Sequence, residues 1–392
     1  MATTADPQQP VAAAQPSEKS AALSSNPPGI TGPTGPRKTP VAHPHPSSKP
    51  RAPPRPLTAD ESAKYDQVLS TVSQWTTVPT STARGAPTEP ITGGERMWLT
   101  RECILRYLRA TKWNAPEAAR RLQATLAWRR EFGVDALTPE GVSRENETGK
   151  QVLFGFDTDG RPCLYLNPAR QNTDEWKGQL QHLVYMLERV IDVMPPGQET
   201  LALVISYGGT SRGKSGPGLA GGKEVLGILQ GHYPERLGRA LITELPWFIS
   251  TFYKLIRPFI DPITRDKMHF NEALSSHIPP EQLIASHGGE VDFEYDHQEY
   301  WPALTELAKQ RREEMRARWE KDGKKVGASE WMLRGGEVEE GGKNEEVGNV
   351  EEKIGELKVE DKKEEPKEDE KKEEPKEAST ESTTSANAEM KA

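Results

Sequence analysis

Cysteine is nearly absent from this chain, and so are long uncharged hydrophobic runs. Its 392 residues include only two cysteines, Cys103 and Cys163, which excludes a disulfide framework and a cysteine-rich zinc site. The most hydrophobic stretch, residues 246–260, contains Lys254 and Arg257 and is shorter than the roughly 18 apolar residues that a membrane-spanning helix needs. The first residues lack the apolar segment of a secretory signal. We therefore expect a cytoplasmic protein in a reducing compartment, with no segment that spans a membrane.

Hydrophobic residues make up 34% of the chain, which is low for a globular protein. The deficit lies at the two ends. Residues 1–56 contain 14 of the 33 prolines, and residues 321–392 contain 22 acidic and 14 basic residues, which accounts for the whole net charge of −8. We expect a disordered Pro-rich arm at 1–56 and a disordered acidic Glu/Lys-rich tail at 321–392. The remaining body is charge-balanced, so net charge gives no support to nucleic-acid binding.

The first part of the body has helical periodicity. Thr58 and Asp60 can cap a helix that runs through Val72, and apolar residues recur at helical spacing over 96–110. Asn114 caps a third helix, which Gly133 ends. These segments predict a compact three-helix lobe over residues 57–135.

From Gln151 onward, strand patterns alternate with helical ones. Such alternation predicts an α/β domain with a mixed, largely parallel sheet flanked by helices, over residues 140–320. The expected strands are a hairpin at 151–156 and 161–167 around the turn 157–160, then 201–206, 239–245 and 267–270, with helices at 174–194, 223–230 and 246–260.

Gly208–Ser215 reads GGTSRGKS and satisfies the phosphate-cradling P-loop pattern. That chemistry needs a helix whose first turn meets the phosphates. The next residues, Gly216–Gly222, include four glycines and a proline, so we expect no helix to start before Lys223. A P-loop nucleotide-binding protein is therefore only a remote alternative. The sequence also has no GxSxG or HExxH motif, and its eight histidines are scattered, so we expect no enzyme, no metal and no cofactor.

The most informative stretch is His232–Phe270. It contains YPERLGRA from Tyr233 and PFIDPITRDK ending at Lys267, and it resembles the CRAL-TRIO domain of the yeast-type phosphatidylinositol transfer proteins. LRYLRATKW, DTDGRP and the HGG at His287 follow the expected order, and the resemblance is closest to the fungal azole-tolerance (pleiotropic drug resistance) subgroup. It implies a three-helix lobe on an α/β domain with a deep hydrophobic lipid pocket, covering about 57–320.

The resemblance also implies an activity. Such a protein extracts phosphatidylinositol from a membrane into a gated pocket and exchanges it for a second lipid, here a sterol or another phospholipid, which supports phosphoinositide or sterol homeostasis. The implied partners are these lipids and a membrane surface of the endoplasmic reticulum, lipid droplet or cell periphery, with no nucleic acid and a monomeric protein. A lipid-sensing regulatory module without bulk transport is the alternative, which the sequence does not separate from transport.

Carried over by motif, the implied head-group contacts are Glu235, Thr264, Lys267 and Lys112. Lysines would offset phosphate charge, the threonine hydroxyl would donate to a phosphate oxygen, and the glutamate would accept from inositol hydroxyls. Read alone, each is equally a surface charge or a turn cap. Thr111 stands where phosphatidylinositol/phosphatidylcholine exchangers have Arg, which puts one phosphate contact in doubt.

The helix at 246–260 would be the gate. Ser250, Lys254 and Arg257 form one polar stripe, and the rest of its surface is apolar, although an ordinary core helix has the same periodicity. On the strand 201–206, leucines stand where the exchangers have hydroxyl residues for choline phosphate, so we expect phosphatidylcholine to bind poorly. The residues concerned are Trp247, Phe248, Phe252, Tyr253, Ile256 and Phe259 on the gate, and Leu201 and Leu203 on the strand.

Overall fold

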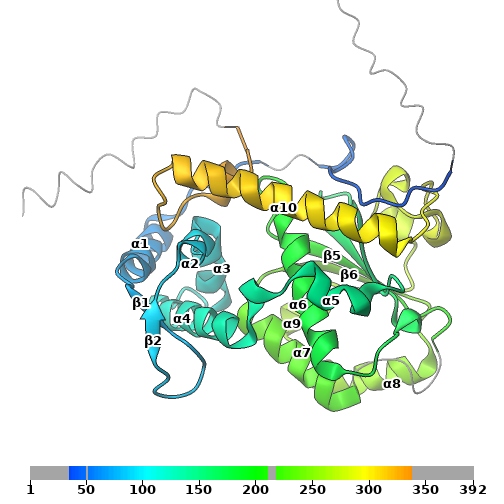
Figure 1. The fold of residues 1–392 in the computed structure, drawn as a ribbon, viewed down its shortest axis with the longest axis horizontal. Helices are drawn as coiled ribbons and strands as arrows, with labels where there is room; N and C mark the ends of the chain where they lie inside the picture. The colour runs from blue at the N-terminus through cyan, green and yellow to red at the C-terminus, as the bar shows by residue number, and fades with distance from the viewer. Residues whose placement is uncertain (1–34, 50–51, 211–217, 338–392) are drawn as a thin grey trace, which may run out of the picture. The chain divides into compact units, whose positions relative to one another are not determined.

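The computed structural model describes residues 35–49, 52–210 and 218–337. Their architecture confirms the expected α/β class, with a helical lobe beside a mostly parallel five-stranded sheet (Figure 1). The lobe has its own apolar core, in which Ile104, Leu108 and Leu122 are fully buried. It consists of α1 (Ala59–Ser73), the hairpin strands β1 (Thr77–Pro79) and β2 (Thr88–Pro90), α2 (Gly93–Trp98), α3 (Arg101–Ala110) and α4 (Ala115–Phe132).

Polar caps set the helix ends of the lobe. Thr58 forms a reciprocal capping box with Glu61 at the start of α1, and the Asn114 side chain accepts from the amide of Glu117 at the start of α4. The single helix expected over 96–110 is instead two, because Thr100 caps α3 and interrupts the helical run. This cap satisfies amide groups that a continuous helix would have bonded to its own backbone.

The sheet has the order β3-β4-β5-β6-β7, in which only the β3–β4 pair is antiparallel. The expected hairpin is confirmed: Asp157 closes its turn by accepting from the amides of Asp159 and Arg161. Gly155 has a φ of 67° beside a register shift, and a Cβ there would meet the carbonyl oxygen of Gln282. The strands are β3 (Gln151–Phe156), β4 (Pro162–Leu166), β5 (Leu201–Ser206), β6 (Leu237–Thr243) and β7 (Met268–Phe270).

Helices cover the sheet and connect it to the lobe. α7 packs against both α4 of the lobe and α8, and α10 packs along α6 and then against α11 (Figure 1). Pro258 lies inside a short 3-10 turn, Arg257–Phe259, so α8 ends earlier than the helix expected over 246–260. The helices are α5 (Pro139–Ser143), α6 (Trp176–Asp192), α7 (Gly218–His232), α8 (Trp247–Ile256), α9 (Pro262–Asp266), α10 (His297–Lys321) and α11 (Glu330–Leu333).

The expectation that no helix starts before Lys223 is wrong. α7 begins at Gly218 and includes Gly221 and Gly222, both of which are buried. Each helical glycine costs about 1 kcal/mol relative to alanine, so intrinsic propensity disfavours this start and the burial of the first turn is a tertiary effect that the sequence pattern does not reveal. The start at Gly218 still lies beyond the Gly-Lys-Ser of the P-loop-like motif, whose residues 211–217 are outside the described part.

The folded body extends beyond both boundaries expected from composition. Residues 35–49, inside the arm expected over 1–56, contact the body: Lys38 pairs with Asp296 and Glu299, and the amide of Arg37 donates to the carbonyl oxygen of Asp292. Residues 321–337 also pack on it, and Glu330 of α11 is buried against α3. A few specific contacts hold these segments in place. Because the segments lack hydrophobic periodicity, composition did not predict that they belong to the folded body.

Candidate functional site

Three of the four predicted head-group residues lie together at the starts of β6 and β7. Glu235 is in the turn between α7 and β6, two residues before Leu237. The Nζ of Lys267 donates to the carbonyl oxygen of Leu237 at 2.7 Å, and the amide of Lys267 donates to the carbonyl oxygen of Thr264. Each of the three side chains is partly exposed, so a ligand can reach all of them.

Lys112 comes to the same region through the end of α3. Its side chain is exposed in the turn between α3 and α4, and its amide donates to the carbonyl oxygen of Arg109. Arg109 in turn lies 3.7 Å from Glu235, measured from Nε to Oε2, and also pairs with Glu199. The lobe therefore places one cation, Arg109, beside Glu235, and the exposed Lys112 lies three residues further along the chain.

Sequence reasoning missed Arg109. The family comparison drew attention to Thr111, but the Thr111 hydroxyl donates to the carbonyl oxygens of Tyr107 and Leu108 and finishes α3. The sequence did contain a signal for it, because Arg109 is a basic residue only two positions before Thr111. Its long side chain reaches the turn that contains Glu235.

Two of the predicted head-group residues have left-handed backbones. Glu235 has a φ of 60° and Lys112 a φ of 51°, and only six described non-glycine residues have a positive φ. This conformation costs a residue with a side chain on the order of 1–3 kcal/mol, and such strain is typical of functional sites. The other four residues, for which no ligand contact is predicted, are Trp113, Glu244, Asn271 and Lys324.

α8 buries one stripe and exposes another. Ile249 and Ile260 are buried, and Tyr253 stacks edge-to-face on Phe270 of β7, with ring centroids 5.1 Å apart. The exposed surface contains Lys254 and Arg257 of the expected polar stripe. Large apolar side chains are exposed beside them, through the 3-10 turn and into α9: Trp247 (67% exposed), Leu255 (57%), Phe259 (47%) and Ile263 (62%).

The other predicted gate residues are less exposed. Ile256 and Phe248 are partly buried, and the Trp247 and Phe248 rings contact each other edge-to-face. The side chain of Phe252 lies outside the described part of the chain. Leu255 and Ile263 were not among the predicted residues, because helical periodicity alone does not tell which apolar side of α8 faces the sheet.

The two faces of the central strands are covered unequally. On one face Val204 of β5 and Leu241 of β6 are paired and fully buried. On the other face, which carries the Phe270 that contacts α8, Leu203 and Ile205 of β5 are only partly buried, whereas their β6 partners Ala240 and Ile242 are buried. Leu201 also belongs to this face by alternation but is buried at the start of β5. Within this face, β5 therefore keeps accessible apolar surface on the α8 side.

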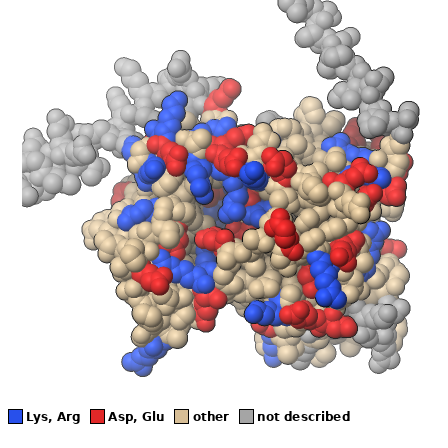
Figure 2. Space-filling view, in the orientation of Figure 1, with Lys and Arg blue, Asp and Glu red and all other residues tan. Residues whose placement is uncertain are grey.

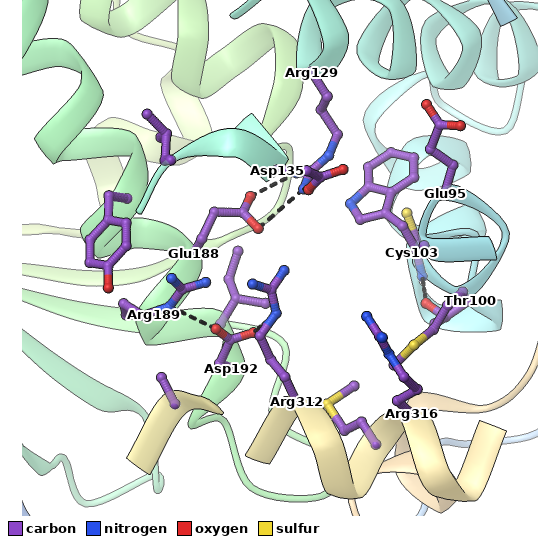
Figure 3. A pocket seen from close by; sticks show the side chains of 18 of the residues that line it. Glu95, Thr100, Cys103, Arg129, Asp135, Glu188, Arg189, Asp192, Arg312 and Arg316 are labelled. Carbon is purple, nitrogen blue, oxygen red and sulfur yellow. Dashed lines mark hydrogen bonds and ion pairs between the residues drawn. The ribbon is translucent and has the colours of Figure 1, made fainter. Parts of the chain in front are cut away.

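A cavity of about 770 Å³ lies elsewhere, between the helical lobe, α6 and α10. Figure 2 shows charges of both signs along α10 and around the hollow beside it. Figure 3 shows Arg129 of α4, Glu188 and Asp192 of α6, and Arg312 of α10 around this space. None of the described predicted site residues lines this cavity.

Ion pairs compensate most of these charges. Arg189 and Arg312 both pair with Asp192, and Arg129 pairs with Glu188. Burial lowers the pKa of Arg236 to about 10, with a further contribution from the neighbouring Arg106. The cavity is thus lined by paired charges at the interface between the lobe and the sheet domain, unlike the apolar surface of the sheet on its α8 side.

Comparison with known proteins gave matches in both parts of the fold. The CRAL/TRIO domain family matches residues 146–289, which include Glu235, Thr264 and Lys267, and the CRAL/TRIO N-terminal domain matches residues 64–124, which include Lys112.

Two curated relatives cover most of the described body. The chain is 51% identical over 306 residues to a CRAL-TRIO domain-containing protein of Schizosaccharomyces pombe. The aligned region is 78% of this chain and 30% of that protein. It is 41% identical over 258 residues to the phosphatidylinositol transfer protein PDR17 of Saccharomyces cerevisiae, covering 63% of this chain and 73% of that protein. The solved crystal structure of Sfh5 is 17% identical, with a TM-score of 0.45, over 66% of this chain and all of that one.

Proposed function

The chain belongs to the CRAL/TRIO family, and from this premise we propose that it binds phosphatidylinositol and transfers it between membranes. The observation that carries the proposal is the unequal covering of the sheet. Leu203 and Ile205 keep accessible apolar surface on the α8 side, while Val204 and Leu241 on the other side are fully buried. In a well-packed protein such surface is normally covered, so we assign it to the acyl chains of a lipid.

Selectivity then depends on the head group. A lipid that moves from a bilayer into an apolar pocket exchanges one hydrocarbon environment for another. The hydrophobic free energy of roughly 0.8 kcal/mol per buried CH2 therefore largely cancels in the transfer. Hydrogen bonds to charged groups contribute about 1.5–3 kcal/mol each. In our proposal Lys267 and Lys112 neutralise the phosphate, Thr264 donates to it, and Glu235 accepts from inositol hydroxyls.

Arg109 has a positioning role in this proposal. Its guanidinium lies 3.7 Å from Glu235 and 3.0 Å from Glu199, so it holds the Glu235 carboxylate at the lobe side of the site. It also replaces, from a neighbouring position, the positive charge that Thr111 does not provide. Both lobe and sheet domain thus contribute to head-group recognition.

We propose that the second lipid is a sterol, or another phospholipid whose head group needs few hydrogen bonds from the protein. Leu203 faces the α8 side of the sheet with an aliphatic side chain and offers no donor for choline phosphate. We therefore propose that phosphatidylcholine is a poor ligand.

Membrane contact is assigned to the exposed apolar surface of α8 and α9. Leu255, Phe259 and Ile263 protrude there beside Lys254 and Arg257, a combination suited to a bilayer interface with anionic lipids. No helix within the described residues is both long and apolar enough to cross a bilayer. We propose peripheral, transient association, with α8 as the gate.

A vesicle-to-vesicle transfer assay with labelled lipids tests the function. We expect transfer of phosphatidylinositol, little transfer of phosphatidylcholine, and loss of the former in the double variant Glu235→Ala, Lys267→Ala. Glu281→Ala is the control, because it removes an exposed carboxylate that lies outside the predicted contacts and outside the ion pairs of Arg109. Equal transfer of both phospholipids, or unchanged transfer in the double variant, would overturn the proposal.

Mass spectrometry of the bound lipid separates this function from its alternatives. A carrier returns phosphatidylinositol intact after incubation, whereas a hydrolase would return cleaved lipid. A sensing module would bind the lipid but show exchange far slower than that of a transfer protein in the same assay.

A further inference from the structure

Two histidines and a glutamate meet at the end of β7, on the other side of the sheet from α8. His269 pairs in register with Leu241, whose side chain is on the buried face. Glu272 lies in the turn after β7, and His277 follows the 3-10 turn Leu274–Ser276. The scattered histidines predicted no metal site, yet the turn folds this HxxExxxxH segment onto itself.

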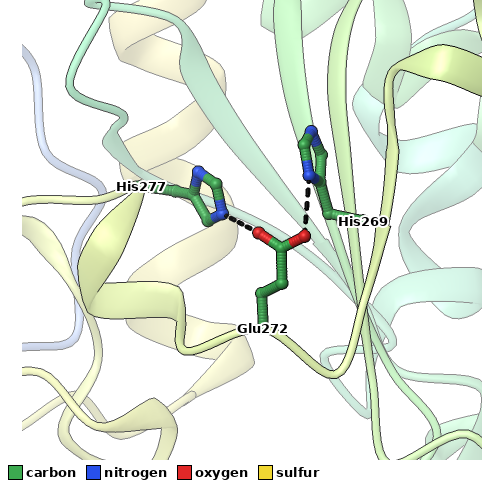
Figure 4. A group of neighbouring side chains, drawn as sticks. All are labelled: His269, Glu272 and His277. Carbon is green, nitrogen blue, oxygen red and sulfur yellow. Dashed lines mark hydrogen bonds and ion pairs between the residues drawn. The ribbon is translucent and has the colours of Figure 1, made fainter.

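The three side chains converge on one point (Figure 4). The Nδ1 of His269 is 3.0 Å from one carboxylate oxygen of Glu272, and the Nε2 of His277 is 2.7 Å from the other. All three candidate ligand atoms lie within 4.8 Å of one another. Ligand atoms about 2.1 Å from one zinc ion are roughly 3.0–3.4 Å apart, so small side-chain rotations suffice to close the set around an ion.

The backbone that carries this group is fixed. The carbonyl oxygen of His277 accepts from the amide of Thr158 in the β3–β4 turn, and its own amide donates to the carbonyl oxygen of Leu274. The next residue, Ile278, is fully buried. His269 is held by the β6–β7 ladder, so both imidazoles are positioned before any ion arrives.

We propose that His269, Glu272 and His277 form a binding site for a divalent transition-metal ion of the zinc class. Two imidazole nitrogens and one carboxylate are borderline-soft ligands that suit zinc, while calcium and magnesium prefer sites built from oxygen alone. The Glu272 side chain is 47% exposed, which leaves a fourth position open to water. The ion would replace the protons that now join the imidazoles to the carboxylate.

The site would brace the edge of the sheet. β7 is the last strand in the sheet order and pairs with only three residues of β6. It directly follows Lys267, so an ion at its far end would hold the strand against the 274–278 turn without entering the lipid region. The proposal does not depend on lipid binding.

Zinc binding to the full chain tests the site. After chelator treatment and exchange into buffer, the protein is titrated with Zn²⁺ by calorimetry and with Co²⁺ by visible absorption. We expect one tight equivalent and the absorption bands of four-coordinate Co²⁺. Loss of a residue that only hydrogen-bonds to a metal ligand already weakens metal binding about 10–100-fold, so His277→Ala and Glu272→Gln, which remove ligands, are each expected to weaken it 100-fold or more.

His43→Ala is the matched control, because it removes an exposed histidine outside the group and is expected to keep the tight equivalent. Melting curves with excess chelator show whether each variant is folded, and the half-exposed Glu272→Gln is expected to melt like the metal-free protein. The proposal is overturned if wild type binds no more tightly than the double variant His269→Ala, His277→Ala. It is also overturned if Glu272→Gln and His277→Ala both keep the tight equivalent.

Discussion

Arg129 of the helical lobe and Glu188 of the sheet domain form a buried ion pair, with Nη1 and Oε1 2.7 Å apart. The hydroxyl of Tyr233 donates to the same carboxylate oxygen at 2.7 Å. Burial by itself would raise the pKa of Glu188, but Arg129 and Tyr233 outweigh it and lower the pKa to about 2. This carboxylate is therefore one of the buried links between the two parts of the fold.

Replacing Glu188 by Gln is expected to lower the free energy of unfolding by about 3–5 kcal/mol, because it leaves the buried Arg129 without its main partner. Asp135→Asn is the control: Asp135 also pairs with Arg129 but is exposed, so we expect a change below about 1 kcal/mol. Urea unfolding at pH 7 measures both. Equal changes in the unfolding free energy for the two substitutions would contradict a stabilising role for the buried Arg129–Glu188 ion pair.

The same pair predicts a pH dependence. Because the folded-state pKa of Glu188 is below its ordinary value, its contribution to stability is present above pH 4.5 and is lost as the pH falls toward 2. The difference in unfolding free energy between wild type and Glu188→Gln is thus expected to shrink over that range. A difference that stays constant down to pH 3 would argue against the ion pair.

Glu235→Gly separates the strained backbone from the carboxylate. Glycine adopts the φ of 60° without the steric cost, so we expect unchanged or higher thermal stability together with loss of phosphatidylinositol transfer. Lys324→Gly relieves a similar φ of 59° at an exposed position after α10 and is expected to keep transfer. Full transfer by Glu235→Gly would show that the carboxylate has no part in recognition.

Leu203→Thr is expected to increase phosphatidylcholine transfer, because it puts a hydroxyl donor on the α8 side of β5. Val204→Thr is the comparison on the opposite, fully buried face, where an unpaired hydroxyl costs about 1–3 kcal/mol of stability and adds no new ligand contact. Transfer assays with both lipids and a melting curve distinguish the two variants. No gain of phosphatidylcholine transfer in Leu203→Thr would count against this strand as the selective surface.

Leu255→Ser with Ile263→Ser is expected to weaken binding to vesicles about tenfold or more, since each exposed side chain loses the gain of burial in the interface. Met332→Ser removes a similarly exposed apolar side chain on α11, outside α8 and α9, and should bind as wild type does. Co-sedimentation with liposomes measures all three. An equal loss in Met332→Ser would point to general hydrophobic adsorption.

Deleting the acidic tail is expected to strengthen binding to anionic vesicles at low salt, because the tail is repelled by them. Composition places the start of the tail after residue 320, but the described body extends to residue 337, so the deletion should begin after residue 337. Residues 338–392 contain 19 acidic and ten basic residues, whereas 321–337 include the buried Glu330. A cut after residue 320 should destabilise the body, and weaker vesicle binding after the cut at 337 would reveal a docking role for the tail.

Local signals predicted much of this fold from the sequence. The DTDGRP turn located the β3–β4 hairpin, and Thr58 and Asn114 located the starts of α1 and α4, because each cap or turn acts on residues a few positions away. Contacts between distant segments were not predictable in this way. Nothing near Arg109 in the sequence indicates Glu235 as its partner, and nothing near His269 indicates that a turn brings back His277.

The candidate site divides along the same line. The motif match supplied Glu235, Thr264 and Lys267, and the structure brings these three together at adjacent strand starts. The exposed apolar surface of α8 and α9 was only partly predicted, because apolar residues surround α8 on most sides. Which of them remain exposed depends on how Ile249 and Ile260 pack, and that is a property of the assembled sheet.

The pair between Arg106 and Glu330 has a consequence for the order of folding. Arg106 is buried in α3, and Glu330, 2.6 Å away, comes from α11 near the end of the described chain. During synthesis the lobe emerges long before Glu330 does, so the nascent lobe holds a cation whose nearest buried partner has not yet been made. We therefore expect the lobe to complete its packing only after α11 has left the ribosome.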